Sequence, residues 1–340
     1  MSSPAASIPI RIWAASLDQL GRVLGTQSFP TTLAGYRQLH RWLSSFGQLD
    51  KVGVEGTGSY GSALARHLTR AGGQVIEIAR PNRQVRRRYG KTDVIDAIAA
   101  ARVVQSGEAT GTPKSNDGPV EALRALKVVQ RSANKSRTQA LNQIHNLLVT
   151  APEELRARLT PMLRRERLAT CAAFRVRADD DSLLAVTRLA LRELAQRVLT
   201  LDAQLTDITT RLRRITQAVA PELMALQAVG PDSASTLLVA AGDNTDRLAT
   251  ESAFAALCGS NPILASSGKT NRHRLNRAGN RQANAAPWRI VFVRLGCDER
   301  TRDYVTKRTA EGKSKAEIMR CLKRYVAHEV YAAQPREALS

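Results

Sequence analysis

The sequence has little of what membrane spans, disulfide frameworks and zinc sites require. Its 340 residues contain no run of eighteen apolar residues, and the opening MSSPAASIPIRIW lacks the basic and then apolar layout of a signal peptide. The four cysteines form no CxxC pair and the five histidines form no HxxxH pair, which disfavours disulfides and zinc alike. We therefore expect a cytoplasmic protein with reduced thiols and no contact with a membrane.

Acidic residues are also scarce relative to basic ones. The chain carries 51 Lys and Arg against 30 Asp and Glu, which gives a formal net charge of +21. Such an excess is the electrostatic footprint of a polyanion-binding protein, so nucleic acid is the expected partner. Charge alone leaves open a ribosome-associated or merely basic protein. The 43% hydrophobic content is sufficient for two or three folded domains.

The order of predicted elements indicates an α/β region followed by helices. Residues 9–80 alternate strand and helix patterns, as in IRIWAASLD, TLAGYRQLHRWLSSFG, KVGVE and QVIEIA, which predicts a mixed α/β sheet. Residues 120–149 are helical throughout, and Pro152 ends that pattern. We divide the chain into a sheet domain at 1–110, a helical region at 111–220 and a mainly helical domain at 221–340.

A heptad pattern dominates the end of the helical region. Its apolar residues alternate spacings of four and three, which is typical of a coiled-coil seam and predicts a homo-oligomer held by this arm. A core helix with a wide apolar stripe would fill the same positions. The seam consists of Leu194, Val198, Leu201, Leu205, Ile208, Leu212, Ile215 and Val219.

Two segments of the last third are candidates for contact with phosphate. LQAVGPDSASTLLVAAGD predicts a short helix, a Gly-Pro turn and a second helix, whose start offers backbone N–H groups to phosphate or is an ordinary helical turn. SSGKTNRHRLNRAGNRQAN is a basic loop or strand pair with little to bury. Its candidate nucleic-acid-binding residues are Lys269, Arg272, Arg274, Arg277 and Arg281. Further on, Ser314 and Glu317 form a capping box that predicts a helix start.

Three carboxylates are notable in so basic a chain. Glu55 ends the apolar strand KVGVE before the flexible GTGSYG, so we expect it at the edge where open α/β sheets place their sites. Asp93 and Asp96 open KTDVIDAIAAARV and should lie on one face of a helix. Mg²⁺ takes oxygen ligands, and paired ions about 4 Å apart stabilise the attacking and leaving oxygens of phosphodiester chemistry. Alternatively, Asp93 caps the helix and Asp96 is solvated.

A pair of hydroxyls, Ser266 and Ser267, leads into the basic segment. A serine nucleophile for phosphate chemistry needs nearby positive charge to stabilise developing negative charge, and the following Lys and Arg residues supply it. The tail SGKT imitates a P-loop, but Ile263 stands where that motif needs glycine. An ordinary Ser-Ser-Gly turn is the other interpretation.

Taken together, several motifs in one order resemble the IS110 class of RNA-guided insertion-sequence transposases. The resemblance covers nearly the whole chain. It is carried by LDQLGRVLGTQSFPTTLAGYRQLHRWL, VEGTGSYG, ARPNRQVRRRYGKTDVIDAIAAARV, SRTQALNQIHNLLVTAPEELR, CGSNPILASSGKTNRHRLNRAGNRQAN, WRIVFVRL and RTAEGKSKAEIMRCLKRYVAHEVY.

The resemblance implies a fold and a chemistry. It implies an RNase H or RuvC-like DEDD domain, a helical coiled-coil region and a C-terminal transposase domain. By the same resemblance, Glu55, Asp93 and Asp96 belong to the Mg²⁺ site, and Ser267, or less favourably Ser266, forms a covalent phosphoserine link to DNA. The implied activity is cleavage and rejoining of element and target DNA by an oligomer that an element-encoded RNA guides.

The sequence departs from the family pattern at its beginning. The family has a first strand with an Asp before the strand represented by IRIWAASLD, and the expected position falls near Ala6. Asp18 does not replace that carboxylate, because it lies at the far end of the following strand, at a hairpin turn. Either the true start lies upstream, or the protein binds nucleic acid without cutting it. A Holliday-junction nuclease would share the carboxylates but would have no use for Ser267.

Overall fold

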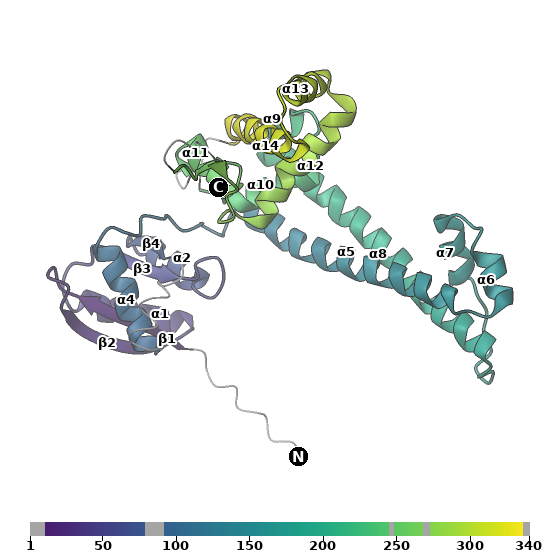
Figure 1. Cartoon of the computed structure of the whole chain (residues 1–340). Helices are drawn as coiled ribbons and strands as arrows, with labels where there is room; N and C mark the ends of the chain where they lie inside the picture. Colours follow the sequence, from purple (N-terminus) through teal and green to yellow (C-terminus); the bar gives the residue numbers. More distant parts are fainter. Residues whose placement is uncertain (1–10, 79–91, 245–247, 268–272, 336–340) are drawn as a thin grey trace, which may run out of the picture. The chain divides into compact units, whose positions relative to one another are not determined.

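The computed structural model describes residues 11–78, 92–244, 248–267 and 273–335 (Figure 1). Its contacts divide the chain into two compact units, which we describe separately. The first comprises the described parts of Met1–Gly118 and Ala241–Ala249, and the second those of Pro119–Ala240 and Thr250–Pro335.

The first unit is an α/β structure, as predicted, but its described strands form two separate two-stranded sheets and not one mixed sheet. β1 and β2 form an antiparallel hairpin, whereas β3 and β4 pair in parallel because helix α2 crosses between them. Helix α4 packs against strands of both pairs. The elements are β1 (Arg11–Leu17), β2 (Val23–Pro30), α1 (Leu33–Ser44), β3 (Lys51–Glu55), α2 (Ser62–Arg70), β4 (Gln74–Ile78) and α4 (Asp93–Gln105).

Strand alternation gives this unit two apolar layers. Val75 joins a core with Leu39 and Leu68 of helices α1 and α2. Its neighbour Ile76 points to the opposite face, where it packs in a smaller cluster with Val104 of α4. Helix α4 therefore covers the face of the β3–β4 pair opposite to the main core.

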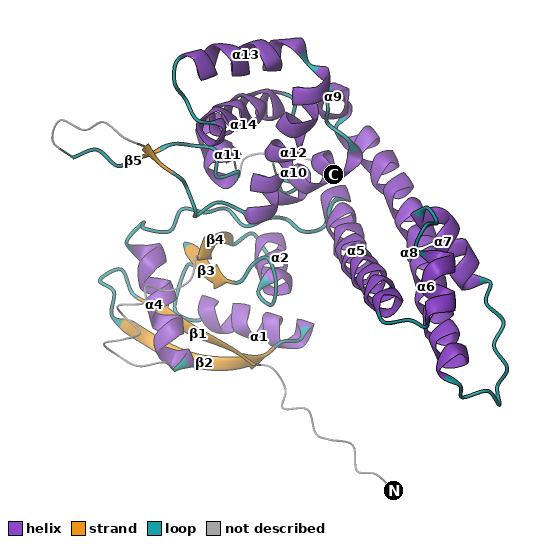
Figure 2. Ribbon diagram, turned by 45° about the vertical axis from the view of Figure 1, so that its right-hand side comes forward, coloured by secondary structure: helices purple, strands orange, loops and turns teal. Residues whose placement is uncertain are grey.

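The second unit contains a long helical hairpin. Helices α5 (Pro119–Val149) and α8 (Leu183–Val219) run side by side and antiparallel, and α6 (Glu153–Leu159) and α7 (Arg164–Ala172) pack at their far end (Figures 1 and 2). The long helix α5 ends at Val149, as predicted, and Pro152 is the N-cap residue of α6.

The predicted heptad seam of α8 has its partner inside the same chain. Val198, Ile208 and Leu212 are buried, and α8 contacts α5 along its length. Arg137 of α5 forms an ion pair with Asp202 of α8 in the middle of the hairpin. Burial of the seam therefore does not require a second copy, and self-association through the arm stays a prediction.

The remaining helices form a bundle around α10, whose residues are buried on nearly every side. The capping box of Ser314 and Glu317 is confirmed at the start of α14. In the described part of the chain, no helix is long and apolar enough to cross a membrane. The elements are α9 (Pro221–Ala225), α10 (Pro231–Ala241), α11 (Glu251–Leu257), β5 (Ile263–Leu264), β6 (His273–Arg274), α12 (Arg281–Cys297), α13 (Glu299–Ala310) and α14 (Lys315–Ala332).

Candidate active site

Glu55 is the last residue of β3, and its side chain is exposed, as the sequence predicts. The chain then turns back sharply: Gly56 adopts a φ of +67°, and the Gly61 N–H donates to the Gly56 carbonyl at 3.0 Å. A Cβ atom on Gly61 would lie 2.3 Å from the Glu55 carbonyl oxygen. Glycine is therefore required for the loop to fold back onto the end of this strand.

The loop after Glu55 is held by a polar brace. The Thr57 hydroxyl is buried and donates to the Glu77 carboxylate of β4 at 2.6 Å. Asn116 donates from its side-chain amide to the Thr57 carbonyl at 3.2 Å. The sequence pattern did not predict a role for Thr57, Glu77 or Asn116. Asn116 adopts a positive φ of 55°, a conformation in which asparagine is more frequent than most residues. The brace fixes the backbone that presents Glu55.

Asp93 and Asp96 occupy the first turn of α4. The N-cap is Thr92, whose hydroxyl accepts the Ile95 N–H at 3.2 Å, so the interpretation of Asp93 as the cap is wrong. Asp93 is exposed and Asp96 is half-buried. Carboxylates in the first turn are favoured by the helix dipole, which offsets part of their mutual repulsion.

The three predicted metal ligands thus come from β3 and α4, which pack against each other. A Cβ atom on Gly53 would lie 2.6 Å from a methyl carbon of Val104, so strand and helix meet closely at this point. Their carboxylates are the hard oxygen donors that suit Mg²⁺. Among the described residues, however, no three His, Cys, Asp or Glu side chains converge into a metal site. The position near Ala6, where the resemblance places the fourth carboxylate, lies outside the described residues.

Asp18 has a structural role in the β1–β2 turn. Its carboxylate accepts the backbone N–H groups of Leu20 and Arg22 at 2.9 and 2.8 Å and pairs with the Arg22 guanidinium at 2.7 Å. The hydrogen bond from the Arg22 backbone is the main reason that the pKa of Asp18 is lowered. Asp18 is therefore bound within the turn, which agrees with the prediction that it does not replace the absent ligand.

Ser266 and Ser267 lie on an exposed β-hairpin of the second unit. They follow β5, which pairs with β6 through Ile263 opposite Arg274 and Leu264 opposite His273. Three of the predicted basic residues lie in β6 or after it and are exposed: Arg274, Arg277 and Arg281. Lys269 and Arg272 lie outside the described residues. The exposed serines and the following arginines thus occupy one segment.

The base of this serine hairpin is tightly anchored, although its serines are exposed. Asn276 is buried, and its side chain donates to the Asn261 side chain at 2.5 Å and accepts the Ala278 N–H at 2.8 Å. The Asn280 N–H donates to the Leu257 carbonyl at 2.7 Å. These bonds join the chain after the hairpin to the end of α11, so the hairpin base is held in a defined position.

Two family models match the chain, one over the region of the three carboxylates and the other over the region of the serine hairpin. Residues 11–151 match a transposase model of the IS110 DEDD type, and residues 220–306 match the model described as the transposase IS116/IS110/IS902 family. This chain belongs to the IS110 class of insertion-sequence transposases. A search of curated proteins found no match.

In this transposase, the first matched region contains Glu55, Asp93 and Asp96, and the second contains Ser267. The second region also contains the segment predicted as a short helix, a turn and a second helix. The second helix is confirmed as α10, but the helix before it, α9, ends at Ala225, ahead of the predicted segment that begins at Leu226, and a turn joins the two. The turn includes Ala228, a non-glycine residue with a φ of 64°.

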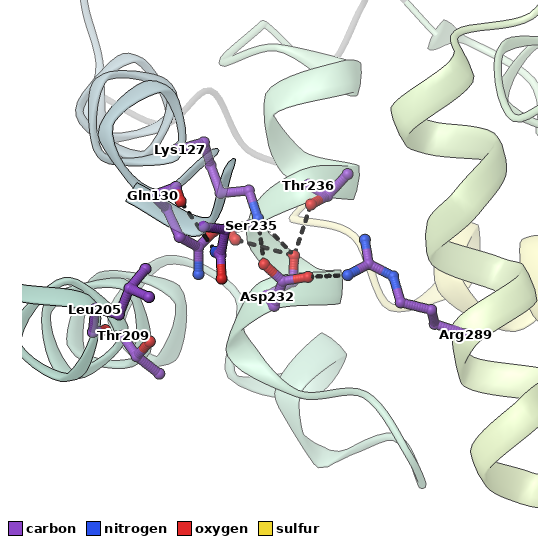
Figure 3. Close-up of polar contacts among 9 residues, drawn as sticks. Lys127, Gln130, Leu205, Thr209, Asp232, Ser235, Thr236 and Arg289 are labelled. Atoms are coloured by element: carbon purple, nitrogen blue, oxygen red, sulfur yellow. Dashed lines mark hydrogen bonds and ion pairs between the residues drawn. The ribbon is translucent and has the colours of Figure 1, made fainter. Parts of the chain in front are cut away.

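The start of α10 carries an acidic residue, Asp232, which forms a cluster with two cations of other helices (Figure 3). Its carboxylate pairs with buried Lys127 of α5 and with Arg289 of α12. Burial raises the pKa of Asp232, but the hydrogen bond and charge of Lys127, together with Arg289, lower it more. Burial is also the main reason that the pKa of Lys127 is lowered. An anion of the protein itself already lies at this helix start, which disfavours phosphate binding there.

Proposed function

We propose that this transposase cleaves and rejoins DNA with Ser267 as its nucleophile and with Glu55, Asp93 and Asp96 as ligands of Mg²⁺. The observation that carries this proposal is the serine hairpin, which exposes Ser267 and is followed by exposed arginines on a firmly anchored base. Phosphodiester exchange needs an accessible hydroxyl and positive charge for the phosphates, and this segment contains residues of both kinds.

The proposed reaction conserves the energy of the phosphodiester bond. The Ser267 oxygen forms a bond to phosphorus, the bond from phosphorus to a sugar oxygen breaks, and that oxygen takes up a proton. Attack by the hydroxyl of another strand then reverses the step, which frees Ser267 and joins the new strand. In this proposal, the exposed Arg274, Arg277 and Arg281 neutralise backbone phosphates of the bound DNA.

The carboxylates form the second half of the proposal. Glu55 and the aspartates of α4 present oxygen donors from a strand end and a helix start, and bound Mg²⁺ would stabilise charge on phosphodiester oxygens. A fourth carboxylate would come from a strand before β1, as the family resemblance implies. We further propose that the active form is an oligomer guided by an element-encoded RNA.

A second candidate is a relative that binds DNA without cutting it. Such a relative would have a carboxylate site that compensates too little of the charge of Mg²⁺ to support cleavage. The two candidates differ in one measurable respect, which is formation of a covalent bond between protein and DNA.

The experiment that tests the proposal traps the covalent intermediate. We would incubate the protein and its Ser267→Ala and Ser266→Ala variants with Mg²⁺, its guide RNA and labelled DNA, and resolve adducts on denaturing gels. The expected result is a labelled adduct that Ser267→Ala abolishes and Ser266→Ala retains. An adduct that survives in Ser267→Ala would contradict the assignment of this serine.

Further variants distinguish the transposase from the non-cutting relative and from a Holliday-junction nuclease, which would share the carboxylates. Glu55→Gln should abolish exchange while salt-sensitive DNA binding persists, because the amide removes an anionic ligand without changing the shape of the side chain. Cutting of supercoiled DNA without rejoining would favour the nuclease. Tight binding without product at any Mg²⁺ concentration would favour the non-cutting relative.

A further inference from the structure

Helix α12 exposes a stacked aromatic pair that the proposed chemistry does not use. The rings of Trp288 and Phe292 are 5.3 Å apart between centroids and inclined by only 13°. The two residues are 45% and 60% exposed. A stacked pair of large apolar side chains in solvent indicates an interaction surface.

The aromatic pair lies on the side of α12 opposite to its packed face. Ala283, Ala286 and Ile290 are fully buried, and the helix packs against α13 and α14. Trp288 and Phe292 are one helical turn apart, so their side chains point the same way and form one continuous surface. We call this pair the aromatic platform.

The charge around the aromatic platform indicates an anionic partner. Helix α12 contains no Asp or Glu. Arg281 lies seven residues before Trp288, which places it on the same face about 10 Å away along the helix axis. Arg281 and Arg277 are exposed, and within the described residues neither forms an ion pair.

A second copy of this chain is a poorer fit to the same surface. In a symmetric dimer the surface would meet its own copy, which brings arginines against arginines with no acidic residue from α12 to compensate. A nucleic-acid strand supplies what the surface lacks, because its bases offer flat faces and its phosphates offer negative charge.

The aromatic platform is also held in place. Arg289, next to Trp288, points into the second unit and pairs with Asp232, which in turn bonds Lys127 (Figure 3). These pairs tie α12 to α10 and α5. Because the charge of Arg289 is already paired, Arg281 and Arg277 are the cations available for phosphate.

We propose that Trp288 and Phe292 stack against an unpaired nucleobase of a DNA or RNA strand, while Arg281 contacts a neighbouring phosphate. The proposal rests on the proposed function only in that the transposase binds nucleic acid, and it does not require Ser267 or the carboxylates to act. The aromatic platform, which follows the serine hairpin along the protein chain, would hold a nucleic-acid strand in its unpaired form.

Fluorescence of Trp288 gives a direct test. Because the chain has three tryptophans, Trp13→Phe and Trp42→Phe leave Trp288 as the single reporter. We would titrate this full-length protein with single-stranded DNA, single-stranded RNA and duplex DNA of equal length. We expect single strands to quench the fluorescence of Trp288 more strongly than duplex DNA does. The single strand that quenches it more, DNA or RNA, identifies which nucleic acid supplies the stacked base.

Binding measurements on tryptophan variants complete the test. Trp288→Ala in the natural background should weaken single-strand binding by about 5-fold to 150-fold, since stacking contributes about 1–3 kcal/mol per base, whereas Trp288→Phe retains most affinity. Tyr325→Ala, which removes another exposed aromatic ring, is the matched control and should bind as the unchanged protein does. Circular dichroism would establish that each variant is folded.

Two results would overturn the proposal. One is unchanged single-strand affinity in folded Trp288→Ala. The other is a fall in oligomer size in Trp288→Ala without nucleic acid, measured by sedimentation, which would assign the aromatic platform to a second copy. Ser267→Ala separates the two proposals, because it should abolish the DNA adduct and leave Trp288 quenching intact.

Discussion

At the scale of single residues, Gly279 lies where the backbone after the serine hairpin packs closely against the end of α11. A Cβ atom at this position would lie 2.6 Å from the Gly259 nitrogen and 2.8 Å from the Leu257 carbonyl oxygen. Both neighbours are backbone atoms, so a side chain at position 279 cannot be accommodated by a rotamer change. Gly259 itself has a φ of +59°, which favours glycine.

Gly279→Ala should therefore shift the hairpin base and misplace Ser267. We expect adduct formation to fall by at least ~10-fold, since small displacements of reacting groups have large effects on rate, while stability falls by about 1–3 kcal/mol. Single-turnover adduct assays and urea unfolding would measure the two effects. Gly296→Ala is the matched control, because a Cβ atom there meets nothing within 4 Å. Equal adduct rates in both variants would contradict the expected coupling between hairpin base and serine.

At the scale of elements, one acidic residue connects three helices. Asp232 of α10 pairs with Lys127 of α5 and Arg289 of α12. The Lys127 side chain is only 4% exposed, so its ammonium depends on this carboxylate for charge compensation. Buried charges are costly when a partner is removed.

Asp232→Ala should consequently destabilise the second unit by about 3–5 kcal/mol, because it leaves buried Lys127 unpaired. Combining it with Lys127→Met should recover part of the loss, as measured by urea unfolding of both variants. The pH dependence has a defined sign: since the folded pKa of Asp232 is lowered, its contribution is present above about pH 4 and is lost as the pH falls through the lower folded value. A double variant no more stable than Asp232→Ala would argue against this coupling.

At the scale of the whole molecule, the net charge of +21 is the property most relevant to nucleic-acid binding. The excess of cations favours long-range attraction to nucleic acid and makes affinity depend on salt. Individual arginines contribute to this dependence only where they meet phosphates and release counterions.

Replacing Arg277 and Arg281 with Ala should reduce the slope of log affinity against log salt for duplex DNA by about 2, or about 1 per phosphate contact. Filter binding between 50 and 200 mM salt would measure the slope. Arg22→Ala is a suitable control, because Arg22 already pairs with Asp18. An unchanged slope in the double variant would place the phosphate contacts elsewhere in the chain.

Several elements and the family of this transposase follow from patterns that are local in the chain. The apolar strand KVGVE, the end of the long helix before Pro152 and the capping box of Ser314 depend on near neighbours in the sequence, and each appears as predicted. The family motifs are equally local in sequence, which is why they identified the class before any fold was known. Their order was sufficient to select Glu55 and Ser267 for testing.

Which faces of helices and strands meet is a property of the fold. The heptad seam of α8 could pair with any apolar helix, and its partner is α5 of the same chain. Thr57 and Glu77 are twenty residues apart, so their hydrogen bond has no local signal. The exposure of Trp288 also follows from packing, because helix α12 buries its opposite side through Ile290. Burial depends on packing between distant segments, and periodicity within one segment does not specify that packing.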